Sequence, residues 1–233
     1  MAIYKGDLIL KKMKKYYKGI LILIIFIVIV AIAIMVWQFW REEHIDRSLI
    51  TGQPCSPPCW QDITPGVTNQ VDATNILRRS TFLDHTSLRV NGDSKDGGCL
   101  WEWIVPSKGM LPLMIWRNGT VSEIKLGLTY YVELQDAFNR YGPPEAITSV
   151  QGGNPEKWYW SVDLYYPHIG LELRIFTDDF SSEVTPHTEI VAVLYYAPKT
   201  LTERIIEKYG SDTSVFVRHW EGFGEIGDIG KYY

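Results

Sequence analysis

The sequence predicts an α+β protein: one N-terminal transmembrane helix followed by an external domain of two helix-plus-antiparallel-meander repeats. Three observations predict this class. An uncharged run of eighteen residues lies near the N-terminus, helix-start signals precede groups of short alternating strands, and two parts of the chain correspond at an offset of 61 residues, which places Gly66 on Gly127.

The apolar run extends from Ile20 to Trp37. As a helix it is roughly 27 Å long, enough to cross a hydrocarbon core. Six lysines and one acid precede it, whereas one arginine and two glutamates follow directly, so the lysine excess predicts a cytoplasmic N-terminus. The run is longer than the apolar core of a signal peptide, and no favourable cleavage site follows. We therefore expect a basic cytoplasmic segment (1–19), an uncleaved membrane helix (20–40) and an extracytoplasmic remainder.

The charge and the cysteines of the remainder, residues 41–233, limit its partners. It carries 17 Lys and Arg against 26 Asp and Glu, which argues against nucleic acid as a partner. All three cysteines lie in it, where an oxidising environment favours disulfides. Cys55 and Cys59 flank a Ser-Pro-Pro turn and are the preferred pair, while a bridge from either of them to Cys99 stays open.

A polar stalk (41–54) is expected to lead into the first repeat, residues 55–126. Thr68 is a candidate N-cap for a helix that ends near Ser80. Strands then follow at Ser87–Val90, Cys99–Val105, Leu113–Arg117 and Thr120–Leu126. The Asn118-Gly119 dipeptide between the last two indicates a type I′ hairpin.

The second repeat, residues 127–198, begins in the same way. A helix follows Gly127-Leu128-Thr129 and is stopped by Gly142, and three strands follow at Trp158–Tyr166, Leu171–Thr177 and Ile190–Tyr196. In the C-terminal part (199–233), Thr200 and Glu203 form a capping box for a helix that ends at Tyr209, before a tail rich in glycine and aromatic residues. The apolar residues of this helix are expected to be buried: Leu201, Ile205 and Ile206.

This repeated order resembles the repeat of the SmpA/BamE lipoproteins and the beta-lactamase inhibitor proteins over about Thr64–Pro198. The resemblance rests on Pro65-Gly66-Val67-Thr68, Tyr141-Gly142-Pro143-Pro144 and Arg117-Asn118-Gly119-Thr120-Val121. Together with Thr64–Thr68, the segment Pro54–Trp60 also looks like an uncharacterised family of membrane-anchored exported bacterial proteins. The first resemblance implies a module that binds other proteins or scaffolds envelope assemblies; the second implies no activity.

Several motifs with chemical associations lack their structural context. The Gly-x-Gly-x-x-Gly pattern from Gly222 to Gly227 does not open a helix within a βαβ unit. A calcium-loop register is broken at two of its positions, with Asn91, Asp93 and Glu102 matching it and Lys95 and Asp96 violating it. Cys55-x-x-x-Cys59 outside an anchor resembles the motif of Sco-type copper carriers, but the antiparallel surroundings favour a structural disulfide.

Acidic residues and a histidine cluster at one place in the sequence, in a polar loop: Asp178, Asp179, Glu183 and His187. Paired carboxylates suit acid–base or metal chemistry, but no nucleophile elbow or HExxH helix accompanies them. We therefore expect no enzyme activity, no catalytic residues, no metal site and no cofactor. A hydrolase or a thiol-dependent metal carrier is the remaining alternative.

Two pairs of tryptophans at i and i+2 each place both rings on one face of a strand: Trp101 with Trp103, and Trp158 with Trp160. They fit either the core, which large aromatic side chains dominate, or an exposed platform. The sequence thus predicts a membrane-anchored, non-catalytic binding protein of the bacterial cell envelope. These tryptophans are its candidate binding residues and another envelope protein is its partner, with a glycan-binding surface protein as the alternative.

Overall fold

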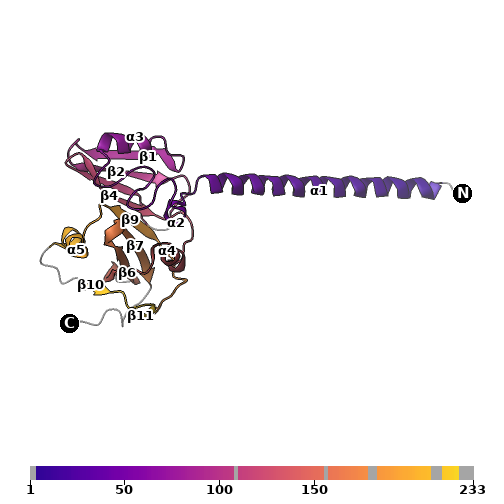
Figure 1. The fold of residues 1–233 in the computed structure, drawn as a ribbon. Coiled ribbons are helices and arrows are strands. Elements are labelled where there is room, and N and C mark those ends of the chain that lie inside the picture. Colours follow the sequence, from indigo (N-terminus) through magenta and orange to yellow (C-terminus); the bar gives the residue numbers. More distant parts are fainter. Residues whose placement is uncertain (1–3, 108–109, 155–156, 178–182, 211–216, 226–233) are drawn as a thin grey trace. The chain divides into compact units, whose positions relative to one another are not determined.

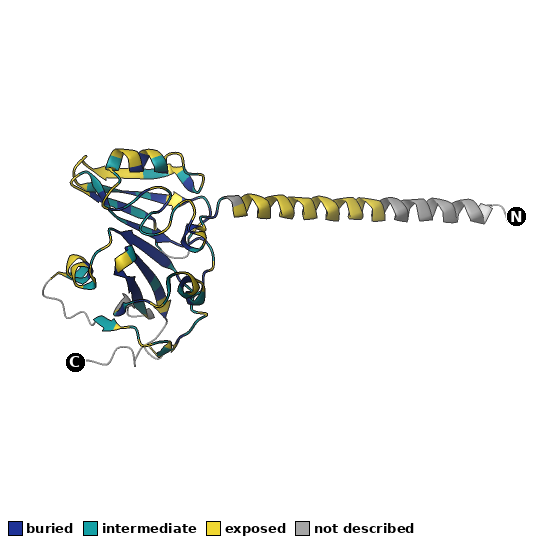
Figure 2. Cartoon of the chain, viewed as in Figure 1, coloured by how far each residue is buried: buried dark blue, intermediate teal, exposed yellow. Residues whose placement is uncertain are grey.

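The computed structural model describes residues 4–107, 110–154, 157–177, 183–210 and 217–225. The chain divides into two units, Met1–His44 and Ile45–Tyr233. The first is a single helix, α1 (Tyr4–Glu43), with a segment Ile20–Glu42 that is long and apolar enough to cross a membrane. Nearly all of this segment is exposed (Figure 2), as expected for a helix whose apolar surface faces lipid. Signal sequences near an N-terminus share this length and composition.

The second unit is built on a nine-stranded antiparallel sheet (Figure 1). The strand order is β1-β2-β3-β4-β9-β7-β6-β5-β10. The strands are β1 (Leu83–Gly92), β2 (Gly97–Trp103), β3 (Leu113–Arg117), β4 (Thr120–Gly127), β5 (Ala146–Asn154), β6 (Lys157–Tyr166), β7 (Leu171–Thr177), β9 (Ala192–Tyr196) and β10 (Val217–His219). Two short strands, β8 (Glu183–Val184) and β11 (Gly224–Glu225), form a second sheet. A mixed α+β fold with one N-terminal apolar helix and a large antiparallel sheet is confirmed.

The strands follow the sequence signals closely where those signals are local. The bounds of β3 and β7 are the predicted ones. Asn118 and Gly119, with φ of 52° and 76°, form the predicted left-handed turn between β3 and β4. Strand β5 was not predicted, because Gly152-Gly153 and its polar residues give no apolar alternation. It forms by pairing with β6 over nine residue pairs.

The helices of the second unit are α2 (Ser48–Thr51), α3 (Gln70–Leu77), α4 (Leu134–Tyr141) and α5 (Leu201–Tyr209), with a 3-10 turn at Pro167–Ile169. The N-caps of α3 and α4 are Asn69 and Glu133, and for α3 this corrects the predicted N-cap, Thr68. The Asn69 side chain accepts a hydrogen bond from the Asp72 N–H, whereas Thr68 Oγ1 accepts one from the Thr64 N–H in the preceding turn. The two helices are consequently 64 residues apart, so the offset of 61 does not hold for them.

The two faces of the sheet differ in chemistry. Residues that alternate along each strand point to opposite faces. One face, here called the apolar face, carries the core, including Met114, Ile124, Leu173 and Val193, and α3 and α4 add Ala73, Leu77, Leu134 and Ala137 to the same cluster. The other face, here called the polar face, carries Glu123, Asp163, Tyr165, Glu172, Arg174 and Tyr196, and α5 contacts these side chains.

Residues 45–54, expected to form a polar stalk, pack instead on the folded unit. Ile45 and Leu49 are buried, and the Trp60 indole N–H donates to the Asp46 carboxylate. The Tyr141 hydroxyl donates to the Leu49 carbonyl, and Arg140 Nη1 to the Ile50 carbonyl. The apolar residues Ile45 and Leu49, which lie between charged residues in the sequence, thus pack this segment against the folded unit.

Candidate functional surface on the polar face

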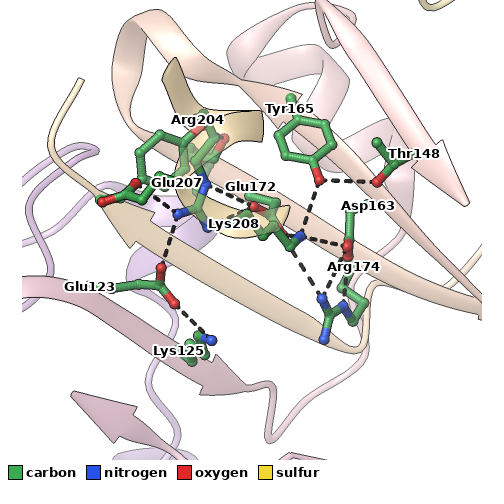
Figure 3. Close-up of polar contacts among 12 residues, drawn as sticks. Glu123, Lys125, Thr148, Asp163, Tyr165, Glu172, Arg174, Arg204, Glu207 and Lys208 are labelled. Atoms are coloured by element: carbon green, nitrogen blue, oxygen red, sulfur yellow. Dashed lines mark hydrogen bonds and ion pairs between the residues drawn. The ribbon is translucent and has the colours of Figure 1, made fainter. Parts of the chain in front are cut away.

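An ion-pair network lies between α5 and the polar face (Figure 3) and comprises Glu123, Asp163, Glu172, Arg174, Arg204 and Lys208. Arg204 is its centre and is only 1% exposed. Its Nη1 donates to Glu123 Oε2 and its Nη2 to Glu172 Oε2, both at 2.9 Å. The guanidinium carbon lies 4.2 Å from the centre of the Tyr196 ring. Arg204 therefore has both carboxylate and aromatic partners in a dry environment.

Lys208 extends the network one helical turn further along α5. Its Nζ donates to Asp163 Oδ2 at 2.7 Å and to the Tyr165 hydroxyl at 3.1 Å, and it also contacts Glu172. Arg174 holds the other side of Asp163 through two hydrogen bonds, of 2.6 and 3.0 Å. The buried carboxylate Asp163 thus has two cationic partners, Arg174 and Lys208, and Glu172 has Arg204, Lys208 and, at 3.9 Å, Arg174, as the burial of charge requires.

The orientation of α5 corrects a prediction. Its capping box between Thr200 and Glu203 is confirmed. However, Arg204 is the buried residue of the helix and Ile206, expected in the core, is 51% exposed. The reason lies in the surface beneath, because the polar face presents carboxylates with which Arg204 and Lys208 of α5 form ion pairs, whereas an apolar side chain could not.

The pKa values of Asp163 and Arg204 shift toward the charged forms. Burial opposes ionisation of Asp163, but the hydrogen bond from Arg174 and the charge of Lys208 outweigh it and lower the pKa. Burial likewise opposes the charge of Arg204, but Glu172 and Glu123 raise its pKa. General acid–base catalysts need the opposite, a pKa close to the working pH. The network is thus suited to holding α5 in place rather than to proton transfer.

An exposed aromatic patch, here defined as Val150, Tyr159 and Phe176, lies on the polar face beyond the network. Their side chains are 42%, 36% and 37% exposed. Val150 lies opposite Ser161, and Ser161 lies opposite Phe176, so the patch spans β5, β6 and β7. The rings of Tyr159 and Phe176 pack edge to face, 5.1 Å apart. An apolar group of this kind on an otherwise polar sheet face is a candidate contact surface.

The predicted tryptophan platform is not formed by Trp101 and Trp103, which are 1% and 6% exposed. They pack with Trp60 into a cluster of three indoles whose ring centres are 5.9 to 6.0 Å apart. Trp160 is half-buried and packs against the same core, and the side chain of Trp158 lies outside the part that the structure describes. The candidate on β6 is instead Tyr159, which alternation places on the face opposite Trp160.

The predicted cysteines and the residues of the predicted acidic cluster are not among the residues of the polar-face network. Cys55 and Cys59 form the predicted disulfide. Cys99 is buried, and burial raises the pKa of its thiol to about 12, so it is inert. Asp178 and Asp179 lie outside the described residues, and Glu183 is in β8. His187 Nδ1 lies 2.9 Å from the Glu133 carboxylate, so its observed partner comes from outside the predicted acidic cluster.

Comparison with known proteins assigns no family. No protein-family model, curated protein or solved structure matches the chain. The function is therefore inferred from the residues of the polar face and from the apolar N-terminal helix.

Proposed function

We propose that the protein is a membrane-anchored, non-catalytic binding protein of the bacterial cell envelope. In this proposal α1 is an uncleaved anchor with its N-terminus in the cytoplasm, and the second unit is extracytoplasmic and contacts another envelope protein. The observation that carries the proposal is the exposed aromatic patch, which lies beside a sheet region rigidified by α5 and its ion pairs.

The form of the patch favours a protein over a glycan. Tyr159 and Phe176 meet edge to face, so the two rings do not form the flat platform on which sugar rings stack. Large aromatic side chains on a rigid element are typical anchors of protein interfaces, where they supply contact area at a low cost in conformational entropy. Val150 adds an aliphatic surface on the neighbouring strand.

The electrostatics of the polar face support binding rather than catalysis. The carboxyls Glu123 and Asp163 have lowered pKa values and the cations Arg174, Arg204 and Lys208 have raised ones. These groups keep their charges at neutral pH and are therefore poor proton donors and acceptors there.

A duplicated helix-plus-meander unit is the proposed origin of this sheet. At an offset of 64 residues, Asp72-Ala73-Thr74-Asn75 of α3 aligns with Asp136-Ala137-Phe138-Asn139 of α4. Each N-cap residue also forms an isolated antiparallel bridge near the start of a strand that joins the two halves. Asn69 pairs with Thr120, the first residue of β4, and Glu133 pairs with Glu189, three residues before β9. Strands β4 and β9 pair and join the two halves.

Site-specific photo-crosslinking in cells tests the proposed contact. A photoreactive residue at position 176 is expected to give a discrete adduct with another envelope protein, and the same residue at Glu102, exposed on β2, is expected to give none. Adding Tyr159→Ser should remove the adduct, because it removes the neighbouring anchor. Equal adducts from both positions, or persistence in the Tyr159→Ser variant, would contradict the proposal.

The proposed topology has its own test. Protease added to spheroplasts or intact cells is expected to digest residues 45–233 while α1 stays with the membrane fraction. A reporter fused after Tyr233 that is active only in the cytoplasm would contradict the orientation. Release of a shortened soluble chain would show that α1 is a cleaved signal sequence.

Glycan binding remains a second candidate because of a hollow of about 270 Å³ near the C-terminus. Two aromatic and four ionisable side chains line it: Trp220, Phe223, Arg218, His219, Glu221 and Glu225. Aromatic rings beside polar groups suit a sugar, although Trp220 and Phe223 also pack on each other and on Phe138. Soluble envelope glycan fragments that change tryptophan fluorescence in the wild type, but not in the Phe223→Ala variant, would support this candidate; the absence of any change would exclude it.

A further inference from the structure

A strained turn lies directly after the disulfide. Trp60 and Ile63 exchange two backbone hydrogen bonds, of 2.9 and 2.8 Å, across the two residues between them. Those residues, Gln61 and Asp62, have φ of 49° and 63°. Both are therefore left-handed, as in a type I′ turn, although glycine or asparagine is usual there. Strained non-glycine positions tend to cluster at functional sites.

The turn brings a carboxylate to the sulfur atoms. A carboxylate oxygen of Asp62 and the Sγ atoms of Cys55 and Cys59 all lie within 4.8 Å of one another. The turn is fixed in place by the fully buried Trp60 and by the Gln61 amide, which donates to Asp46 at 3.2 Å. Asp62 is exposed and both cysteines are half-buried, so solutes reach all three groups.

We propose that Cys55, Cys59 and Asp62 form a redox-gated site for a thiophilic divalent cation of the Zn²⁺ class. A dithiol reductant gives two electrons and two protons to the Cys55–Cys59 bond, which breaks into two thiols, while the reductant becomes a disulfide. The cation then displaces the two thiol protons and binds two thiolates and the carboxylate, with water as a fourth ligand. The inference does not depend on the proposed function.

The ligand types and their separation fit such an ion. Zn²⁺ binds cysteine sulfur and carboxylate oxygen in a tetrahedral arrangement. Two thiolates on one such ion are roughly 3.7 Å apart, given Zn–S distances of about 2.3 Å. The sulfurs reach that separation only after their bond breaks, and the Cys55 and Cys59 Cα atoms, 5.6 Å apart, lie close enough to support it. The oxidised protein therefore excludes the ion.

The third cysteine does not compete for the metal. Cys99 is fully buried in β2, and its thiol stays protonated because burial raises its pKa to about 12. A metal bound by thiolate in the reduced protein therefore reports on Cys55 and Cys59. This makes a spectroscopic test on the whole chain possible.

The test uses full-length protein in detergent, with Co²⁺ as the probe. After reduction with dithiothreitol and removal of the reductant, we expect one Co²⁺ per chain with thiolate-to-cobalt charge-transfer absorption. The oxidised protein and the Cys55→Ser, Cys59→Ser double variant should give none. Reduced protein without this absorption would overturn the proposal.

Asp62→Asn isolates the role of the carboxylate, since asparagine tolerates left-handed backbone at least as well as aspartate. This variant is expected to bind Co²⁺ at least about tenfold more weakly, because the loss of even a residue that only supports a metal ligand typically costs about tenfold or more in affinity. Glu102→Gln, a change at an exposed acid on the face of β2 opposite Trp101, should bind as the wild type does. Equal affinity of Asp62→Asn and the wild type would overturn the three-ligand site.

If reduction of the disulfide loosens the fold around the turn, circular dichroism still decides whether the site binds the metal. The near-ultraviolet circular dichroism of the Trp60, Trp101 and Trp103 cluster reports on the fold around the turn. If reduction weakens this signal, Co²⁺ is expected to restore it in the wild type and not in the Asp62→Asn variant. Failure of the metal to restore it would count against the proposal.

Discussion

Each face of the sheet holds helices, but by different physical means. On the apolar face, Ala73 and Leu77 of α3 are completely buried among aliphatic and aromatic side chains. On the polar face, Arg204 of α5 is buried to 1% exposure among carboxylates, while Ile206 of the same helix faces outward. Burial alone therefore does not reveal what stabilises a helix. The first contact depends on apolar volume and the second on the pairing of charges.

The difference has consequences for tolerance to substitution. Apolar cores accept side chains of similar volume, because transfer free energy and packing are largely retained. A buried ion pair does not accept the loss of one partner, since the other remains as an uncompensated buried charge. Variants that keep volume but remove charge should separate the two faces.

The largest effect is expected in the tryptophan cluster of the apolar face. Trp101→Ala should lower the free energy of unfolding by about 3–5 kcal/mol, because it removes contact area and leaves a cavity. Trp101→Phe should cost clearly less, since the Trp101 indole N–H has no hydrogen-bond partner among the described residues. Urea denaturation of both variants measures the difference. Equal losses would show that this face does not respond to volume.

Arg204→Met tests the polar face by removing the charge while keeping much of the volume. We expect a loss of about 3 kcal/mol or more, because Glu172 is fully buried and loses a cationic partner. Arg117→Met, a matched change at an exposed arginine of β3, should stay within about 0.5 kcal/mol of the wild type. If Arg204→Met were as mild as Arg117→Met, apolar packing rather than charge would hold α5.

Acid should weaken the polar face selectively. Glu123 and Asp163 have lower pKa values in the folded chain, so their contribution is present above the unfolded pKa values, about 4, and is lost as pH falls through the folded ones. Unfolding midpoints of the wild type between pH 7 and pH 3 should therefore fall. In an Asp163→Asn variant the fall should be smaller, and an unchanged pH dependence would remove Asp163 from the explanation.

The smallest effect is expected at Ile206, although it is an aliphatic residue in an amphipathic helix. Ile206→Ser should change the free energy of unfolding by no more than about 0.5 kcal/mol, because the side chain faces outward. Urea denaturation beside the wild type measures this change. A loss above 2 kcal/mol would place Ile206 against a surface and weaken the contrast between the faces.

Local signals in the sequence account for much of the fold but not for the polar face. The Asn118-Gly119 turn, the Thr200 cap and the Cys55–Cys59 bridge depend on neighbouring residues and were predictable. The partners of Arg204 could not be read in this way, because Glu123 and Glu172 are 81 and 32 residues away along the chain. The tryptophan pairs showed which rings share a face but not whether a helix covers that face.

The order of the strands also constrains how the chain reaches this structure. Strand β4 ends at Gly127, yet β9, which pairs with it on the side away from β3, begins only at Ala192. During synthesis the first four strands are therefore complete while one long edge still has open hydrogen-bonding groups, the kind of edge through which proteins aggregate. That edge closes only when β9 pairs with β4, so the centre of the sheet forms after β5, β6 and β7 have been made, and a chain truncated before Ala192 would leave the edge open.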